Sequence, residues 1–304
     1  MKQLPKITIL FSALRGGSTM LRLMLNNHSD IYCPGERDFI FQYVDANGSI
    51  DKKALSNDRI FQDSGIDISN INTVEDFITE DMKDREENNY VIVVRNNLEL
   101  VLRYFPNSKF IHYTRDPRDV ARSSIGMGWA GNVYFGVDHW IDTENNWTEN
   151  ESRMRLLPIL NFRYEDILTN PNFCVLVICK FIGVLFERKM LEFHMNSTYS
   201  EINPNLANQW KRKLTSNQIR LVESKAKEQM IKLGYQMITD ESKLDANSFE
   251  RLYLFLQNKI HVWSFKIRRF GLKNVVLNKI SQYVNLNAIG VKNDMNDIER
   301  NYLK

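Results

Sequence analysis

Residues 7–19 read ITILFSALRGGST, an apolar run followed by a turn that contains two glycines. The run 7–11 is rich in β-branched and apolar side chains, which is typical of a buried strand. From residue 19 to residue 27, apolar side chains recur at helical spacing. A strand, a turn and a helix in this order predict the first part of a parallel βαβ unit.

The turn in this stretch has the composition of an anion site. Two glycines let the backbone curl so that successive N–H groups and the N-terminus of the helix point at one anion. Side chains that can bind the same anion stand beside them, so the candidate residues are Arg15, Gly16, Gly17, Ser18 and Thr19. The chain has no GxxxxGK[ST] loop, which argues against an ordinary ATPase or GTPase. We therefore expect a cradle for phosphate or sulfate.

The alternation of strands and helices continues along the chain. The apolar pattern predicts further strands at 90–94, 109–114 and 157–162, and helices at 98–105, 120–125, 174–182 and 204–235. The polar, acid-rich stretch 45–87 predicts small helices over one face of the sheet, where they would shape an acceptor pocket. We expect an α/β domain at 1–239, with three layers and a parallel sheet of about five strands. A basic helical appendage is expected at 240–304.

A second motif, FIHYTRDPRDVARS at 110–123, begins within another predicted strand. Arg115 leaves the carboxyl end of that strand, the edge at which α/β sheets bind ligands. Asp116 and Ser123 are two helical turns apart, so Ser123 can join Arg115 on an anion beside the next helix. Two anion sites in one parallel sheet imply a ligand with two separated anionic groups, such as a nucleotide phosphorylated at both ends.

The two motifs together resemble those of sulfotransferases that use 3′-phosphoadenosine 5′-phosphosulfate (PAPS). That family combines a strand and an Arg-Ser-Gly-Thr-Thr or similar turn with a later Arg-Asp-Pro-Arg-Asp-Val and a serine. Segments that also resemble the family pattern are 105–110 (FPNSKF), 163–168 (RYEDIL), 181–184 (FIGV) and 210–214 (WKRKL). The resemblance covers residues 6–235, with spacing closest to the tyrosylprotein and bacterial branch. It implies a P-loop-like nucleotide-binding fold.

The resemblance also implies roles for individual residues. The 5′-phosphosulfate would be held by Arg15, Gly17, Ser18 and Thr19, the 3′-phosphate by Arg115 and Ser123, and the adenine by Tyr164. Ser197 and Thr198 fall where the family has another phosphosulfate contact. The implied reaction moves the sulfuryl group of PAPS to a hydroxyl of an acceptor by in-line displacement and gives 3′,5′-ADP. Arg15 would stabilise charge on the departing oxygen, and no metal is needed. Carbohydrate, lipid headgroup and peptide tyrosine all stay open as acceptors.

The candidate general base is Glu36, because an acceptor hydroxyl attacks only when a side chain takes its proton. In the tyrosylprotein branch a catalytic glutamate has the same spacing from the first motif and also follows a cysteine, here Cys33. The alternative is a surface glutamate paired with Arg37. His112, within a strand, and His28, at a helix end, are competing bases that we rank below Glu36.

One departure from the family pattern concerns the lysine of a Lys-x-Pro segment, where this chain reads VVRNN at 93–97. Arg95 is the candidate substitute, although a guanidinium is a poorer proton shuttle than an ammonium. The missing lysine keeps a second interpretation open, a non-catalytic protein that binds PAPS or 3′,5′-ADP. A P-loop-like nucleotide kinase is a third, disfavoured by the absent Walker lysine.

Composition excludes several other functions. With 40 Lys and Arg against 37 Asp and Glu, the net charge of +3 is too small for a nucleic-acid protein. Three cysteines without a paired spacing indicate neither a disulfide framework nor a structural metal. We expect a cytoplasmic protein, since no signal peptide precedes the first strand. The stretch 251–280 is basic, aromatic and free of Asp and Glu, so it is either a solvated helical lid or a peripheral contact with an anionic membrane.

Overall fold

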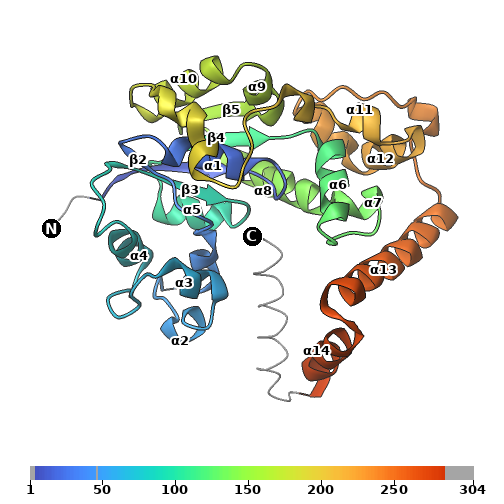
Figure 1. The fold of residues 1–304 in the computed structure, drawn as a ribbon, viewed down its shortest axis with the longest axis horizontal. Helices are drawn as coiled ribbons and strands as arrows, with labels where there is room; N and C mark the ends of the chain where they lie inside the picture. Colours follow the sequence, from blue (N-terminus) through green and yellow to red (C-terminus); the bar gives the residue numbers. More distant parts are fainter. Residues whose placement is uncertain (1–3, 46, 285–304) are drawn as a thin grey trace. The chain divides into compact units, whose positions relative to one another are not determined.

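The computed structural model describes residues 4–45 and 47–284 (Figure 1). The chain divides into two compact units, the first made of Met1–Asp116 and His139–Arg212 and the second of Pro117–Asp138 and Lys213–Lys304. The domain boundary expected between residues 239 and 240 stays a prediction. None of the described helices has both the length and the apolar character needed to cross a bilayer.

The first unit contains a parallel sheet of five strands in the order β2-β3-β1-β4-β5. The strands are β1 (Lys6–Phe11), β2 (Ile31–Tyr32), β3 (Asn89–Val94), β4 (Lys109–Thr114) and β5 (Ile159–Arg163). Ile9 of β1 pairs with Ile92 on one side and with Phe110 on the other. Because β1 lies beside β4 and β4 beside β5, the segments that leave these three strands emerge at one edge of the sheet.

In residues 4–45 and 47–284, six helices cover one face of the sheet, and three of them are the small helices predicted from 45–87. Ile9, Ile92 and Phe110 point to this side and pack in one buried cluster with side chains from the helices that cover it. These are η1 (Asp38–Gln42), α2 (Lys52–Leu55), α3 (Arg59–Ser64), α4 (Val74–Asp81), α5 (Leu98–Tyr104) and α8 (Asp138–Met154).

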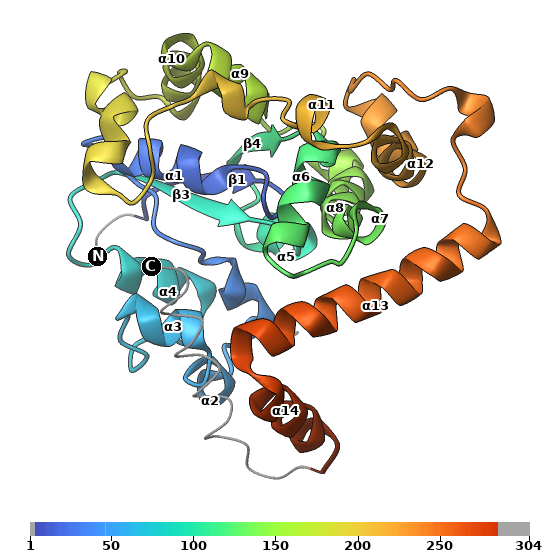
Figure 2. The ribbon, with the colours of Figure 1, turned by 45° about the vertical axis from the view of Figure 1, so that its right-hand side comes forward.

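The alternate residues of the strands, such as Leu10 and Ile111, face a second buried cluster. Its other members come from α1 (Ser18–Asn26), α9 (Tyr164–Thr169), α10 (Pro171–Ile182) and η2 (Arg188–Asn196). Figure 2 shows the sheet between α9 and α10 on one side and α5 on the other. The predicted three-layer α/β fold with a five-stranded parallel sheet is confirmed.

The second unit is helical in the described part of the chain. It comprises α6 (Pro117–Gly126), α7 (Val133–Gly136), α12 (Ser216–Lys232), η4 (Glu241–Lys243), α13 (Ser248–Phe270) and α14 (Leu272–Val284). Arg118 of α6 and Glu223 of α12 form an ion pair of 2.7 Å between Nη1 and Oε1, with both side chains almost fully buried. The charges of this pair hold α6 against α12.

The single helix expected over 204–235 is wrong. The chain there forms η3 (Pro204–Leu206), α11 (Trp210–Lys213) and α12. Asn208 has a φ of 51°, in the left-handed region that ends a helix. Thr215 then begins α12 with a capping box, in which its side chain and that of Gln218 bond each other's backbone N–H.

Candidate functional site

The glycine turn after β1 is built from left-handed backbone. Arg15 has a φ of 64° and Gly17 a φ of 91°, and the Gly16 N–H donates to the Ala13 carbonyl at 2.9 Å. A Cβ on Gly17 would collide with the ring of Tyr164, so this ring packs directly on the turn. Glycine is therefore required at position 17 both for its backbone conformation and for the close approach of the ring.

The helix α1 begins at this turn with its N-terminus exposed to an incoming anion. Its N-cap residue is Gly17, no side chain caps the first turn, and that turn holds no acidic residue. The first N–H groups of a helix have no partner within the helix and carry partial positive charge. The exposed side chains of Arg15 and Thr19 flank this end. The arrangement suits a phosphate or a sulfate.

Arg115, which follows β4, reaches the same turn. Its Nη1 donates to the carbonyl of Arg15 at 3.1 Å, and its guanidinium carbon lies 4.2 Å from the ring centroid of Tyr164. Its Nε is buried and makes no hydrogen bond. Tyr164 begins α9 after β5 and is itself only 7% exposed. The exits of β1, β4 and β5 thus meet at one place.

A cavity of about 400 Å³ lies where these exits meet. Its lining includes seven residues that the sequence analysis named: Arg15, Gly17, Ser18, Thr19, Arg115, Tyr164 and Thr198. The lining residues that it did not name are Met20, Leu168, Phe193, Tyr199, Ser200, Glu201, Ile202, Asn203 and Leu206. The segment 198–206 carries no periodic pattern, and the sequence marked only its first part, through the family resemblance.

Some of the selected residues do not line this cavity. Gly16 is buried beneath the turn, where a Cβ would meet Ser12 Oγ and the Ala13 carbonyl. Ser197 ends η2, and its Oγ accepts the N–H of Tyr199 at 3.2 Å. Ser123 lies on α6, in the second unit.

Glu36 is also outside the lining of the cavity and pairs with Arg95 rather than with Arg37. Its Oε2 lies 3.4 Å from Arg95 Nη1, and its side chain is 48% exposed. Arg95 makes two further hydrogen bonds to Asp38, of 3.0 and 3.1 Å. Arg37 instead pairs with Asp81, at 2.9 Å. Two carboxylates therefore neutralise Arg95, the candidate substitute for the family's lysine.

A carboxylate that the sequence analysis did not assign lies behind Arg115. Glu165 Oε1 accepts the N–H of Asp116 at 3.0 Å, while its Oε2 is buried and has no hydrogen-bond partner. Burial raises the pKa of Glu165 to about 7, although the Asp116 N–H and the charge of Arg115 lower it. The sequence could have pointed to Glu165, because it stands next to Tyr164 in the segment 163–168 that resembles the family pattern.

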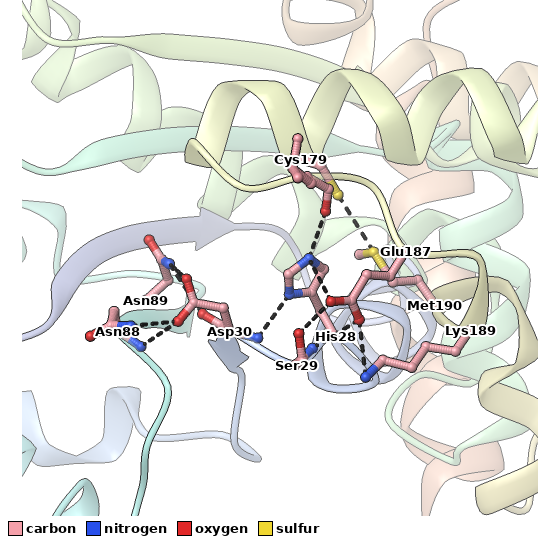
Figure 3. Close-up of polar contacts among 10 residues, drawn as sticks. His28, Ser29, Asp30, Asn88, Asn89, Cys179, Glu187, Lys189 and Met190 are labelled. Carbon is pink, nitrogen blue, oxygen red and sulfur yellow. Dashed lines mark hydrogen bonds and ion pairs between the residues drawn. The ribbon is translucent and has the colours of Figure 1, made fainter.

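His28 is held in a polar cluster at the end of α1, shown in Figure 3. Its Nε2 lies 2.7 Å from the carbonyl of Leu185, and its Nδ1 accepts the N–H of Asp30 at 2.9 Å. Glu187 beside it accepts from Ser29 and pairs with Lys189. Burial raises the pKa of Glu187, but these hydrogen bonds outweigh it and hold the pKa at about 2. Both ring nitrogens of His28 therefore have hydrogen-bond partners within the fold, at the end of α1.

His112 is likewise engaged in the interior. Its Nε2 lies 2.9 Å from Glu144 Oε2, and its ring stacks on Trp147 with 3.9 Å between centroids. Both His112 and Glu144 are almost completely buried, and neither lines the cavity. Within the described residues, no three His, Cys, Asp or Glu side chains gather as a metal site would require.

Comparison with known proteins gives a consistent result. The sulfotransferase domain from the curacin biosynthetic pathway superposes with a TM-score of 0.56 at 20% identity, covering 78% of this chain and 100% of that domain. The sulfotransferase domain from the olefin synthase of Synechococcus PCC 7002 gives a TM-score of 0.56 at 19% identity, covering 74% and 97%. No curated protein matches the sequence. A family model described as the sulfotransferase family matches residues 7–188, more than half of the chain. This chain belongs to the sulfotransferase family.

Proposed function

We propose that this protein transfers the sulfuryl group of PAPS to a hydroxyl of an acceptor and releases 3′,5′-ADP. The observation that carries the proposal is the position of Arg15 and Arg115, which are far apart in the sequence and line one cavity with the N-terminus of α1. A donor with an anion at each end needs positive charge at two places in one cavity.

The residues of the cavity fit such a donor. Gly17 in the turn has a left-handed backbone, and any larger residue at this position would clash with the ring of Tyr164. The helix α1, which follows the turn, has no capping side chain. We assign the 5′-phosphosulfate to Arg15, Ser18 and Thr19, and the 3′-phosphate to Arg115. The buried Tyr164 positions Arg115 by the contact of ring and guanidinium, and the adenine packs against the part of the ring that remains open.

In the proposed reaction the acceptor oxygen attacks sulfur while the bond from sulfur to the phosphate oxygen breaks. Arg15 and the backbone N–H groups at the start of α1 stabilise the negative charge on that departing oxygen. The proton of the acceptor hydroxyl passes to a base, for which we propose Glu36. Arg95 lies between Glu36 and Asp38, and its ion pair with Glu36 would hold that carboxylate in position.

The second candidate is a protein that binds the nucleotide without turning it over. The observation in its favour is Arg95, whose charge is balanced by Asp38 and Glu36 and which does not line the cavity. A cation held in this way supplies less charge to a transfer step than the lysine of the family pattern.

Two measurements on the whole chain separate these functions. Calorimetry with 3′,5′-ADP measures donor-site binding, and labelled PAPS with a panel of saccharides, lipid headgroups and tyrosine peptides measures transfer. Binding with transfer supports the sulfotransferase proposal. Binding without transfer to any acceptor supports the second candidate, and a preference for ATP with magnesium over 3′,5′-ADP would favour a kinase and contradict both.

A further inference from the structure

The longest helix that the structure describes in the second unit, α13, has two apolar sides. One side packs within the unit, where the carbonyl of Leu254 accepts from the Asn132 side chain at 2.8 Å and Asn258 accepts the Gly131 N–H at 2.6 Å. Phe265, on the same side, lies against Gly128 so closely that a Cβ there would collide with its ring. This side of α13 is therefore buried against residues 128–132 of the same unit.

The opposite side of α13, which we call the outer face, is apolar and open. Its large side chains recur three and four residues apart, the spacing of one helix face. They are Phe249 (86% exposed), Leu252 (57%), Tyr253 (63%), Leu256 (52%), Ile260 (67%) and Trp263 (36%). A helix whose outer side meets only water carries polar residues there. A continuous apolar face of this length is typical of a surface that binds something.

Basic side chains accompany the outer face. Lys259, Lys266 and Arg268 are exposed along its margins, and no Asp or Glu occurs between residues 251 and 280. A hollow of about 490 Å³ on this face is lined by Lys259, Ile260, Trp263, Ser264, Ile267 and Arg268. Lys279 of α14 adds a further charge, 4.7 Å from the centre of the Trp263 ring.

We propose that the outer face of α13 binds the surface of an anionic lipid bilayer. An amphipathic helix with aromatic and aliphatic residues on one side and lysines and arginines at its margins lies in the interface, with its apolar side among the acyl chains. The basic margins select anionic headgroups. A second copy of this chain is the less suitable occupant, because a two-fold contact would place the same basic margins opposite each other.

The test is flotation of the full chain with vesicles of phosphatidylcholine alone and of phosphatidylcholine with phosphatidylglycerol in equal amounts. We expect the protein to float with the anionic vesicles only and to be released at high salt. Ile260→Asp should lower the partition coefficient at least roughly tenfold. Replacing Lys259 and Lys266 with glutamine should lower it by about 25-fold, or about fivefold for each lysine.

The matched control is Leu156→Asp, which makes the same kind of change at a side chain 94% exposed in the first unit. It should float like the unchanged chain, and all variants should keep their melting temperature and their affinity for 3′,5′-ADP. The proposal is overturned if the full chain floats with neither vesicle type, or if Leu156→Asp impairs flotation as much as Ile260→Asp. It is also overturned if Ile260→Asp leaves flotation unchanged but dissociates a dimer in light scattering, since the face would then bind a second copy.

Discussion

Arg115 lies over the ring of Tyr164, with 4.2 Å between its guanidinium carbon and the ring centroid. The same guanidinium donates to the carbonyl of Arg15 in the turn after β1. One side chain thus joins the segments that leave β1, β4 and β5. The position of Arg115, which we propose binds the 3′-phosphate, therefore depends on the backbone of the turn, so a change in the turn should alter both proposed anion sites.

Gly17→Ala should abolish measurable binding of 3′,5′-ADP. The substitution places a methyl group in the ring of Tyr164 and forces a left-handed backbone at 91° on a residue that disfavours it. The combined cost should lower the free energy of unfolding by roughly 1–3 kcal/mol. Calorimetry and urea unfolding measure the two effects.

Gly65→Ala is the control for backbone strain alone. Gly65 also has a left-handed φ, of 71°, but nothing lies within 4 Å of the added methyl group. We expect a smaller loss of stability and unchanged nucleotide binding. Equal nucleotide affinity in the Gly17→Ala variant would contradict the contact that we assign to Tyr164.

Glu36→Gln should lower the turnover number by about 100-fold or more while leaving the affinity for 3′,5′-ADP unchanged, because only the proton acceptor is lost. The matched change is Glu201→Gln, at an exposed carboxylate that lines the cavity and pairs with His194. Single-turnover rates with an acceptor from the screen measure both. If Glu201→Gln loses the transfer rate and Glu36→Gln retains it, Glu201 and not Glu36 is the general base.

Glu165→Gln should flatten the dependence of stability on pH. The pKa of Glu165 is about 7 in the folded protein against 4.5 for a free side chain, because burial disfavours the charged form. The folded state therefore binds more protons than the unfolded state between these values, and the stability from this group declines as pH rises from 4.5 to 7.

Between these pH values Glu165 lowers the free energy of unfolding by about 3 kcal/mol at most. Urea unfolding at pH 5, 6, 7 and 8 measures it, and the variant should be the more stable protein at pH 8. The exposed Glu149→Gln, in the same unit, should keep the original pH dependence. A Glu165→Gln curve parallel to that of the unchanged protein would contradict the raised pKa of the buried Glu165 carboxyl.

Glu223→Gln should destabilise the second unit by about 3–5 kcal/mol, since it removes the charged partner that lies 2.7 Å from the buried guanidinium of Arg118. Glu223 also accepts the N–H groups of Ile238 and Thr239, at 3.1 and 2.9 Å. The control is Glu241→Gln, which removes an exposed pair with Lys227 and should leave the unfolding midpoint nearly unchanged. Equal effects of the two changes would show that the buried pair contributes no more than the exposed one.

The sequence predicted the sheet well because its central strands are continuous apolar runs that end at turn residues. It predicted the two arginines of the cavity because Arg115 follows directly on such a strand and Arg15 lies in the glycine turn that follows another. The helix α8 was not predicted, because its buried stripe mixes Trp140, Trp147 and Met154 with polar residues such as Glu144. Burial of those polar groups is decided by partners far away in the sequence, such as His112.

The part of the cavity lined by residues 198–206 could not be predicted either, because its position also depends on contacts that are distant in the sequence. The segment 198–206 has no apolar period, and its position depends on the path of the chain after η2. The pairing of Arg95 with Asp38 and Glu36 was also missed. Neighbouring charges in a loop give no sequence signal that distinguishes one ion pair from another: the alternative considered for Glu36 was a pair with Arg37, which binds Asp81 instead.

The most direct test of the account compares 3′,5′-ADP with 5′-AMP as ligands of the unchanged chain and of Arg115→Lys, by calorimetry. The two nucleotides differ in the 3′-phosphate, which we assign to Arg115. We predict that the substitution weakens 3′,5′-ADP binding by roughly 10-fold to 100-fold, and that 5′-AMP binding falls by a clearly smaller factor, because it loses only the hydrogen bond by which Arg115 supports the turn. An equal loss for both nucleotides, or no loss for either, would contradict the assignment of two anion sites to one donor.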